Sequence, residues 1–276
     1  MEKTLIIEIQ YYGLGDHLFH SHLPRIAKET GKYNKVLISE KSLFRQADTR
    51  RIVWELNPFV DGFIDIEGVS CDVSRLVKIV SNRMMDQVNS TTNLLDEIML
   101  QYGLDDKSRW HDPEIYYKPK FIRDFQKNIF DPNFFSYVGE VNIADMNYFL
   151  KKNNLHFGNV MKLISPKPLH NFNTKTKYIS TPSLGSFCDL IFSCNKLYCL
   201  TSGTATLAAA LNKPATVFWG ENQHLGFQHS KLHNYIKIPF SPYTQFLNVI
   251  KYPYRYIRYE LLKIEKTFST SHISAI

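Results

Sequence analysis

The chain of 276 residues has no long apolar run and few cysteines. Its apolar runs fall far short of the roughly 18 residues that a membrane span needs, which predicts no transmembrane helix. The first ten residues, MEKTLIIEIQ, enter an apolar run of strand length without a cleavage-site pattern, so we expect no signal peptide. The four cysteines, at positions 71, 188, 194 and 199, form no CxxC pair, which indicates reduced, buried thiols rather than a metal site or a disulfide.

Aromatic residues and positive charge are abundant instead. The chain has 16 Tyr and 19 Phe within an apolar fraction of 44%, which is enough to build hydrophobic cores and excludes general disorder. Lysine and arginine number 33 against 26 acidic residues, a net charge of +7. A basic balance suits nucleic acid, an anionic membrane surface or phosphorylated small molecules, and composition does not choose among these partners.

Strand and helix patterns alternate in two blocks of the sequence. The first block predicts strands at 4–9, 35–40 and 63–66, with helices at 16–30, 42–56, 72–88 and 92–103. Pro24 should kink or split the first of these helices. The second block predicts strands at 177–181, 196–200 and 215–219, with helices at 183–194 and 203–211. This alternation is typical of α/β proteins, so we expect two Rossmann-like domains.

The domain boundaries follow from a change of character at residues 105–135, where three prolines interrupt a segment rich in aromatic and charged residues. We place the inter-domain connection there. The expected division is an N-terminal domain at 1–125, a C-terminal domain at 126–250, and a C-terminal helix and tail at 251–276.

A glycine turn in the second block follows a predicted strand, at the edge of a parallel sheet where ligands bind. A helix N-terminus presents unpaired N–H groups and partial positive charge, which suits a phosphate. Glycine would allow close backbone approach and the hydroxyls would add donors, so the turn is a candidate diphosphate cradle. Taken alone, it is better explained as an ordinary turn capped by Ser202. Its residues are Thr201, Ser202, Gly203, Thr204, Ala205 and Thr206.

The glycine turn in the first block contains Gly13, Gly15 and Asp16. It does not complete the GxGxxG pattern, because Leu18 occupies the third glycine position, and this argues against a dinucleotide fingerprint. Asp16 has two interpretations. It could cap the following helix, or it could act as a general base, because a carboxylate at the carboxyl end of a strand faces the cleft between domains.

Two segments together resemble a known family. The second block is similar to the donor-binding half of bacterial heptosyltransferase-like glycosyltransferases over three runs, 183–185, 195–211 and 213–220. In that family an S-L helix start, a [D/S]-[T/S]-G turn and a K/R-P strand follow one another in this order. The segment from Tyr12 to Pro24 resembles the family's N-terminal G-D segment with L-P. The two matches cover roughly 65 residues at opposite ends of the chain, and their order and spacing are more specific than either motif alone.

The resemblance implies a GT-B fold, in which two Rossmann-like domains face a cleft, and an inverting transfer from a nucleotide-sugar to a bacterial surface glycan such as lipopolysaccharide core or capsule. It implies that Asp16 is the general base, that Gly13 and Gly15 lie at the donor, that Gly203 and its neighbours hold the diphosphate, and that Ser183 and Leu184 lie near the nucleobase. No metal or other cofactor is implied, and no convincing DxD loop is present.

The sequence also departs from the family. ADP-heptose enzymes usually carry Asp where Thr201 stands and His where Thr206 stands, which puts ADP-heptose in doubt and allows another activated hexose or heptose. Lys167 is the candidate for the family's basic residue near the start of the C-terminal domain. His17, next to Asp16, is a candidate contact for the acceptor or a phosphate.

Four functions stay open at this point. They are a glycosyltransferase, a nucleotide-sugar epimerase of the same architecture, a non-catalytic nucleotide-sugar-binding homologue, and a nucleic-acid-binding protein. The positive net charge is the only feature that suggests the last of these functions. The basic aromatic tail from Tyr252 to Ile264 has two interpretations: a helix packed back across the domains, or one that sits on an anionic membrane surface. We expect a cytoplasmic protein whose partners are a nucleotide-sugar and a glycan or glycolipid, with the inner membrane as a candidate surface and without nucleic acid.

Overall fold

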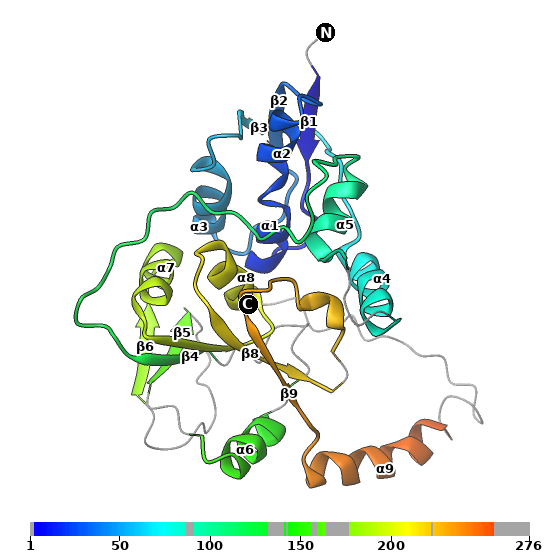
Figure 1. Cartoon of the computed structure of the whole chain (residues 1–276), viewed down its shortest axis with the longest axis vertical. Coiled ribbons are helices and arrows are strands. Elements are labelled where there is room, and N and C mark those ends of the chain that lie inside the picture. The colour runs from blue at the N-terminus through cyan, green and yellow to red at the C-terminus, as the bar shows by residue number, and fades with distance from the viewer. Residues whose placement is uncertain are drawn as a thin grey trace.

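The computed structural model describes residues 3–86, 91–131, 141, 143–155, 159–163, 177–221 and 223–256. It contains two parallel sheets, one of three strands in the N-terminal half and one of six in the C-terminal half. Figure 1 shows the smaller sheet at the top and the larger sheet below it, with helices α1 and α8 between them. The expected α/β class with two parallel sheets is confirmed.

The N-terminal sheet has the order β1-β2-β3 and consists of β1 (Thr4–Ile7), β2 (Lys35–Ser39) and β3 (Gly62–Ile64). The strands pair in parallel because helices return the chain between them; Ile6 lies beside Leu37, and Ile38 beside Phe63. All three predicted strands are therefore present. The helices are α1 (Leu14–His20), α2 (Leu23–Glu29), α3 (Ala47–Thr49) with a π-helix η1 (Arg50–Glu55), α4 (Val73–Asp86) and α5 (Leu94–Gln101).

Two predicted helices differ from the observed ones. The expected break at Pro24 is confirmed, because α1 ends at His20 and Pro24 lies in the first turn of α2, where its missing N–H costs nothing. The helix predicted at 42–56 was wrong in extent. Residues 43–45 form a loop, and only 47–55 are helical, continuing from α3 into η1.

The C-terminal sheet has the order β6-β5-β4-β7-β8-β9, with every neighbouring pair parallel. Counted from β4, this is the strand order 3-2-1-4-5-6 of Rossmann folds. The sequence predicted only the strands β6, β7 and β8. The six strands are β4 (Asn128–Asp131), β5 (Asn159–Leu163), β6 (Lys177–Thr181), β7 (Lys196–Leu200), β8 (Ala215–Gly220) and β9 (Asn234–Ile238).

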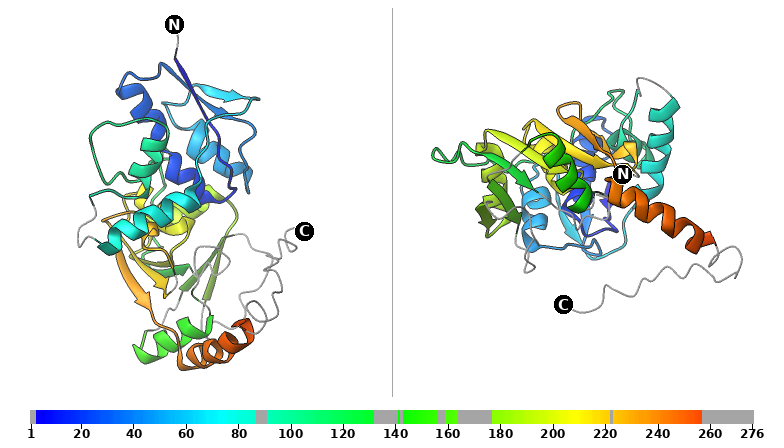
Figure 2. Two further views of the ribbon diagram at one scale, coloured as in Figure 1. Left: turned by 90° about the vertical axis from the view of Figure 1, so that its right-hand side faces the viewer. Right: turned by 90° about the horizontal axis from the view of Figure 1, so that it is seen from below.

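The C-terminal helices are α6 (Ile143–Lys152), α7 (Leu184–Ser193), α8 (Gly203–Ala210), a 3₁₀ turn η2 (Leu225–Phe227) and α9 (Pro242–Tyr256). The two predicted helices of this half, α7 and α8, are confirmed. Helices α6 and α9 lie together at the end of the molecule opposite the N-terminus (Figures 1 and 2). No helix in the described part of the chain is long and apolar enough to cross a membrane.

The two halves share one hydrophobic core that includes residues of both sheets. Hydrogen bonds between described residues of the two halves also join them. The Leu184 N–H donates to the Asp48 carboxylate at 3.0 Å, the Gly226 N–H to the Ser81 hydroxyl at 2.8 Å, and the Asn93 amide to the carbonyl of His229 at 2.7 Å. The division at residues 125 and 126 stays a prediction, but the halves that it separates are in extensive contact.

The linker between the sheets is bonded at both ends. On the N-terminal side, the Glu114 N–H donates to the Ser21 hydroxyl at 2.8 Å, and the Glu114 carboxylate pairs with Arg25 at 2.7 Å. On the C-terminal side, the Tyr117 hydroxyl and the Lys120 N–H both donate to Asp189 of α7, at 2.9 and 2.8 Å. The linker therefore follows the surface of both halves.

Buried histidines should make the fold sensitive to acid. Burial lowers the pKa of five histidines, to about 4 for His17 and His20 and to about 3 for His22 and His229, with His233 lowered as well. The unfolded chain binds protons at these groups from about pH 6.5 downward, while the folded chain does not. Each therefore removes about 1.4 kcal/mol of stability per pH unit between roughly 6.5 and its folded pKa.

We expect the free energy of unfolding to be at least about 2 kcal/mol lower at pH 5 than at pH 7. Asp16 and Asp131, whose pKa values are raised to about 6 by burial, and His111, whose pKa is raised by its bonds to Asp96 and Asp106, act in the opposite direction, but the five histidines outweigh them. Urea unfolding at both pH values measures the difference. His229→Leu should reduce it, whereas His224→Gln, at an exposed side chain, should not. A free energy of unfolding that is the same at pH 5 and pH 7 would contradict the lowered pKa values of the buried histidines.

Candidate functional site

Asp16 lies in the first turn of α1, at the carboxyl end of β1. Gly13, rather than Asp16, is the N-cap residue, so the interpretation of Asp16 as an N-cap was wrong. The Asp16 carboxyl folds back over Gly13, and a Cβ atom at Gly13 would lie 2.5 Å from its Oδ2. Glycine at position 13 therefore provides the space that the carboxyl occupies.

The environment of the Asp16 carboxyl favours proton transfer near neutral pH. Burial raises the pKa of Asp16 to about 6. The backbone N–H groups of Asp16 and Gly13 and the Arg45 guanidinium lower this pKa, but their effect is smaller than that of burial. The side chain is half-buried rather than enclosed. A carboxylate with a pKa of this kind can accept a proton at physiological pH.

The glycine turns of the two halves meet. The Gly15 and Gly203 backbones lie so close that a Cβ at Gly203 would be 3.0 Å from the Gly15 nitrogen and 3.3 Å from the Leu14 Cβ. A Cβ at Gly15 would lie 3.3 Å from the Gly203 Cα and 3.6 Å from the Thr206 hydroxyl. The N-terminal ends of α1 and α8 are thus side by side, and the space beside Gly203 is filled by Gly15 rather than left for a ligand.

The hydroxyls of the second turn are bonded internally. Ser202 caps α8 by accepting a hydrogen bond from the Thr204 N–H at 3.3 Å. Thr201 donates to the carbonyl of Phe218 at 3.3 Å, and Thr206 to the carbonyl of Ser202 at 3.5 Å. The expectation that these hydroxyls serve as free donors was therefore wrong for Thr201, Thr204 and Thr206. The Ser202 hydroxyl only accepts a hydrogen bond, so it keeps its own proton to donate. This turn therefore offers two donors, the Ser202 hydroxyl and the Gly203 N–H, for which no acceptor is recorded among the described residues.

Asp131 is a site residue that the sequence did not identify. It ends β4, beside Cys199 of β7, where the strand order of the sheet reverses, and ligands of Rossmann folds bind at such a switch point. Its carboxyl accepts a hydrogen bond from the Thr204 hydroxyl, and burial raises the pKa of Asp131 to about 6. The run Asn-Ile-Phe-Asp before a proline was the signal: a short apolar strand that ends in an acid.

His17 is part of the core and does not face a ligand. Its Nδ1 accepts a hydrogen bond from the Trp54 indole N–H at 3.0 Å, and its Nε2–H donates to the carbonyl of Leu43 at 2.8 Å. The ring is fully buried and stacks on Phe44 at 4.6 Å. With both nitrogens engaged, His17 cannot contact an acceptor or a phosphate, so this expectation was wrong.

Two further predicted residues, Ser183 and Leu184, lie at the start of α7. Ser183 caps this helix through the Ser186 N–H, and the Leu184 N–H is bonded to Asp48 of the N-terminal half. The structure thus brings Leu184 close to α3, although the two are far apart in sequence. Lys167 lies outside the described residues.

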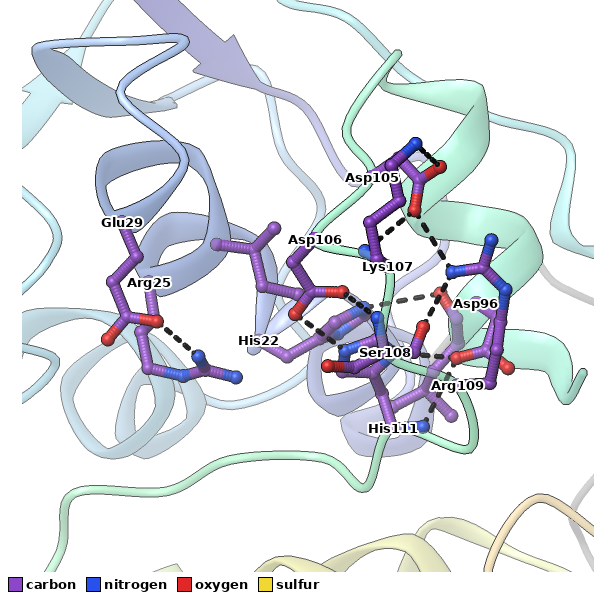
Figure 3. A network of polar contacts seen from close by, with 12 residues as sticks. His22, Arg25, Glu29, Asp96, Asp105, Asp106, Lys107, Ser108, Arg109 and His111 are labelled. Carbon is purple, nitrogen blue, oxygen red and sulfur yellow. Dashed lines mark hydrogen bonds and ion pairs between the residues drawn. The ribbon is translucent and has the colours of Figure 1, made fainter.

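A separate polar network stabilises the N-terminal half (Figure 3). The buried Asp96 carboxylate accepts hydrogen bonds from the Trp110 N–H at 2.9 Å and from His111 Nδ1 at 2.6 Å, and His111 Nε2 donates to Asp106 at 3.1 Å. Burial would lower the pKa of His111, but its bonds to Asp96 and Asp106 outweigh burial and raise it. The network fixes the segment before the linker to α5.

Among the described residues, no group of three His, Cys, Asp or Glu could hold a metal ion.

The comparisons with known proteins identify the fold. Protein-family models and curated proteins show no match to the sequence. The solved structure of a glycosyl transferase family 9 protein from Veillonella parvula is 11% identical and has a TM-score of 0.52, covering 90% of this chain and 89% of that chain. The E. coli heptosyltransferase WaaC with ADP is 9% identical, with a TM-score of 0.51 over 91% of this chain and 98% of that chain.

The E. coli heptosyltransferase TibC in complex with ADP-D-beta-D-heptose has a TM-score of 0.53 at 11% identity. The match covers 84% of this chain but 62% of TibC. At these identities the likeness establishes the fold alone: the chain has the GT-B fold of heptosyltransferases, as the two sequence motifs implied.

The contact between the glycine turns predicts a loss of stability in Gly203→Ala. The added methyl group would force α1 and α8 apart, and such overpacking costs about 1–3 kcal/mol. Gly185→Ala in α7 is the matched control, because its Cβ would lie 3.3 Å from the end of a side chain, the Tyr117 hydroxyl, rather than from backbone atoms, and alanine favours the helix. Urea unfolding should show a destabilised Gly203→Ala and a Gly185→Ala close to wild type. Equal stability of Gly203→Ala and wild type would contradict the tight contact.

Proposed function

We propose that the chain is a glycosyltransferase that moves a hexose or heptose from a nucleotide-sugar to a bacterial surface glycan, either lipopolysaccharide core or capsule. The observation that carries the proposal is the half-buried Asp16 carboxyl with its raised pKa, held beside the N-terminus of α8 by the contact of Gly15 with Gly203. Structures with this fold contain ADP in WaaC and ADP-D-beta-D-heptose in TibC, which supports a nucleotide-sugar donor.

In the proposed reaction, Asp16 takes the proton of the acceptor hydroxyl while the hydroxyl oxygen attacks the anomeric carbon of the donor. The bond from that carbon to the diphosphate breaks on the opposite side, so the configuration inverts. The leaving diphosphate gains negative charge, which the partial positive charge of the α8 N-terminus and the Gly203 N–H would stabilise. This scheme uses no metal or other cofactor.

The donor would lie along the carboxyl edge of the C-terminal sheet. The proposed contacts are backbone groups of the two glycine turns and the start of α7, together with Lys167. Thr201 and Thr206, where ADP-heptose enzymes usually carry Asp and His, are held inside the turn and would act on the donor only through its backbone. The proposed donor-binding set is Gly13, Gly15, Lys167, Ser183, Leu184, Thr201, Ser202, Gly203, Thr204, Ala205 and Thr206.

Asp16→Asn tests the catalytic proposal. We expect sugar transfer at least about a hundredfold slower, because Asn cannot take the proton. The wild-type rate should rise with pH through about pH 6, as Asp16 ionises, and this rise should be absent in the variant. The measurement is single-turnover transfer as a function of pH, with a donor found by a thermal-shift screen of nucleotide-sugars.

Asp72→Asn is the control, because Asp72 is an exposed acid that accepts a hydrogen bond from the Arg75 N–H at the start of α4. It should transfer sugar at the wild-type rate, and Asp16→Asn should still bind the donor. A near-normal rate in Asp16→Asn would remove Asp16 as the base. Interconversion of the nucleotide-sugar without transfer would favour an epimerase, and donor binding without turnover a non-catalytic homologue.

We further propose that the protein acts at the cytoplasmic face of the inner membrane and contacts it through α9. Four large apolar side chains of α9 are between 52% and 71% exposed: Tyr243, Phe246, Val249 and Ile250. Their spacing places them on one helix face. Helix α9 contains Lys251 and Arg255 but no acidic residue. Residues 257–266 add the cations Arg258, Lys263 and Lys266 and the acids Glu260 and Glu265. An exposed apolar face with flanking cations is typical of helices that lie on an anionic bilayer.

Vesicle binding tests this surface. The protein should sediment with anionic vesicles at low salt and be released as salt rises, because each cation near the surface contributes about 1 kcal/mol that salt screens. Replacing Arg255, Arg258 and Lys263 with Gln, or Phe246 and Val249 with Ser, should weaken binding. Phe121→Ser, at a residue 53% exposed on the linker, is the control and should bind as wild type. A wild-type protein that stays in the supernatant at low salt would overturn the proposal.

A further inference from the structure

Two loops meet at the carboxyl end of the N-terminal sheet, next to Asp16. The loop after β1 carries Tyr11 and Tyr12, and the loop after β2 carries Leu43 and Arg45. Backbone bonds join the two loops: the Leu43 N–H donates to the carbonyl of Ile9 at 3.0 Å, and the Arg45 N–H to that of Tyr12 at 3.2 Å. The loops therefore form one surface at the edge where parallel sheets bind ligands.

Buried side chains on the inner side of this surface hold its loops in place. His17 donates from Nε2 to the carbonyl of Leu43 and stacks on Phe44, which points inward. Leu43 and Arg45, the neighbours of Phe44, are exposed. His17 is thus a positioning residue that fixes the loop without touching what binds to it.

Arg45 differs from the next two arginines in the chain, Arg50 and Arg51, which both pair with carboxylates. Its guanidinium lies over the Tyr12 ring, with 5.1 Å from its carbon to the ring centroid, and it forms no ion pair with any described carboxylate. Arg50 also lies over an aromatic ring, that of Phe63, at 3.8 Å, but it is paired with Glu40 at 3.4 Å and with Glu55 at 3.0 Å. Arg45 is therefore a stacked guanidinium whose charge is not neutralised locally.

We propose that Tyr12 and Arg45 form a subsite for a negatively charged group, a carboxylate or a phosphate, on the acceptor saccharide. The guanidinium fork matches the oxygens of either group, and stacking on Tyr12 holds the fork in place, so little side-chain entropy is lost on binding. The exposed part of the Tyr12 ring and Leu43 give the sugar an apolar surface. The inference rests on the proposed function, and it names the chemical class of the acceptor.

The position of the subsite relative to Asp16 supports an acceptor rather than a donor role. The Arg45 N–H is bonded to the carbonyl of Tyr12, four residues before Asp16, and the Arg45 charge also acts to lower the pKa of the Asp16 carboxyl. A saccharide anchored at Arg45 would present its hydroxyls beside the proposed base. The diphosphate, in contrast, is proposed to lie at α8 in the other half.

The experiment uses ligand-observed saturation-transfer NMR on the full chain, with glucuronate, glucose 6-phosphate and glucose as probes in the presence of ADP. For the wild type we expect signals from the two anionic sugars at least about fivefold above that from glucose. In Arg45→Gln the anionic sugars should fall to the level of glucose. Arg50→Gln, the matched control, should keep the wild-type pattern, and Tyr12→Ala should lower all three signals.

Equal signals for charged and neutral sugars in the wild type, or an unchanged preference in Arg45→Gln, would overturn the subsite. Inorganic phosphate added as competitor separates a saccharide site from a bare anion site; displacement of glucuronate by phosphate at equal concentration would overturn the saccharide part. ADP and UDP titrations distinguish this proposal from the donor site. A tenfold loss of nucleotide affinity in Arg45→Gln would assign Arg45 to the donor site and overturn the acceptor subsite. If the wild type binds charged sugars but no nucleotide, the proposed function is rejected and the anion subsite is kept.

Discussion

The approach of Gly15 to Gly203 is the constraint on which the arrangement of the two halves depends. Each glycine belongs to the first turn of a helix that follows a strand, one in each sheet. A side chain at either position would contact the backbone of the other. Because the two turns touch, the carboxyl edges of both sheets face one another, and Asp16 and the α8 N-terminus lie in the same region. The chemistry that we propose requires this proximity.

Polar groups around this contact are mostly committed to the protein itself. His17 supports the loop that carries Arg45, Ser202 caps α8, and Thr204 bonds to Asp131. Such internally satisfied groups hold the backbone in place, which is what a site needs if it is to bind through backbone N–H groups and one carboxylate. Among the described residues around this contact, the groups left for ligands are the Asp16 carboxyl, the Ser202 hydroxyl, the Gly203 N–H and the Arg45 guanidinium.

Much of the fold could be predicted from the sequence, because β1, β2, β6, β7 and β8 are apolar runs bounded by turn residues. Strand β4 was missed, because only Ile129 and Phe130 among its residues are apolar and its central place in the sheet comes from pairing with β5 and β7. The same holds for side chains. The Asp16 position was recognisable from its glycine turn, but the role of His17 depends on Leu43 and Trp54, which are 26 and 37 residues away. Asp131 and Arg45 likewise acquire their environment only from residues distant in the chain.

The linker limits how the two halves can move. Its last anchor on the N-terminal half is Glu114 and its first on the C-terminal half is Tyr117, so only residues 115 and 116 lie between them. The three Cα–Cα steps from Glu114 to Tyr117 span about 10 Å even when the chain is fully extended. The covalent hinge is therefore very short, and any relative motion of the two halves would be a rotation about this point.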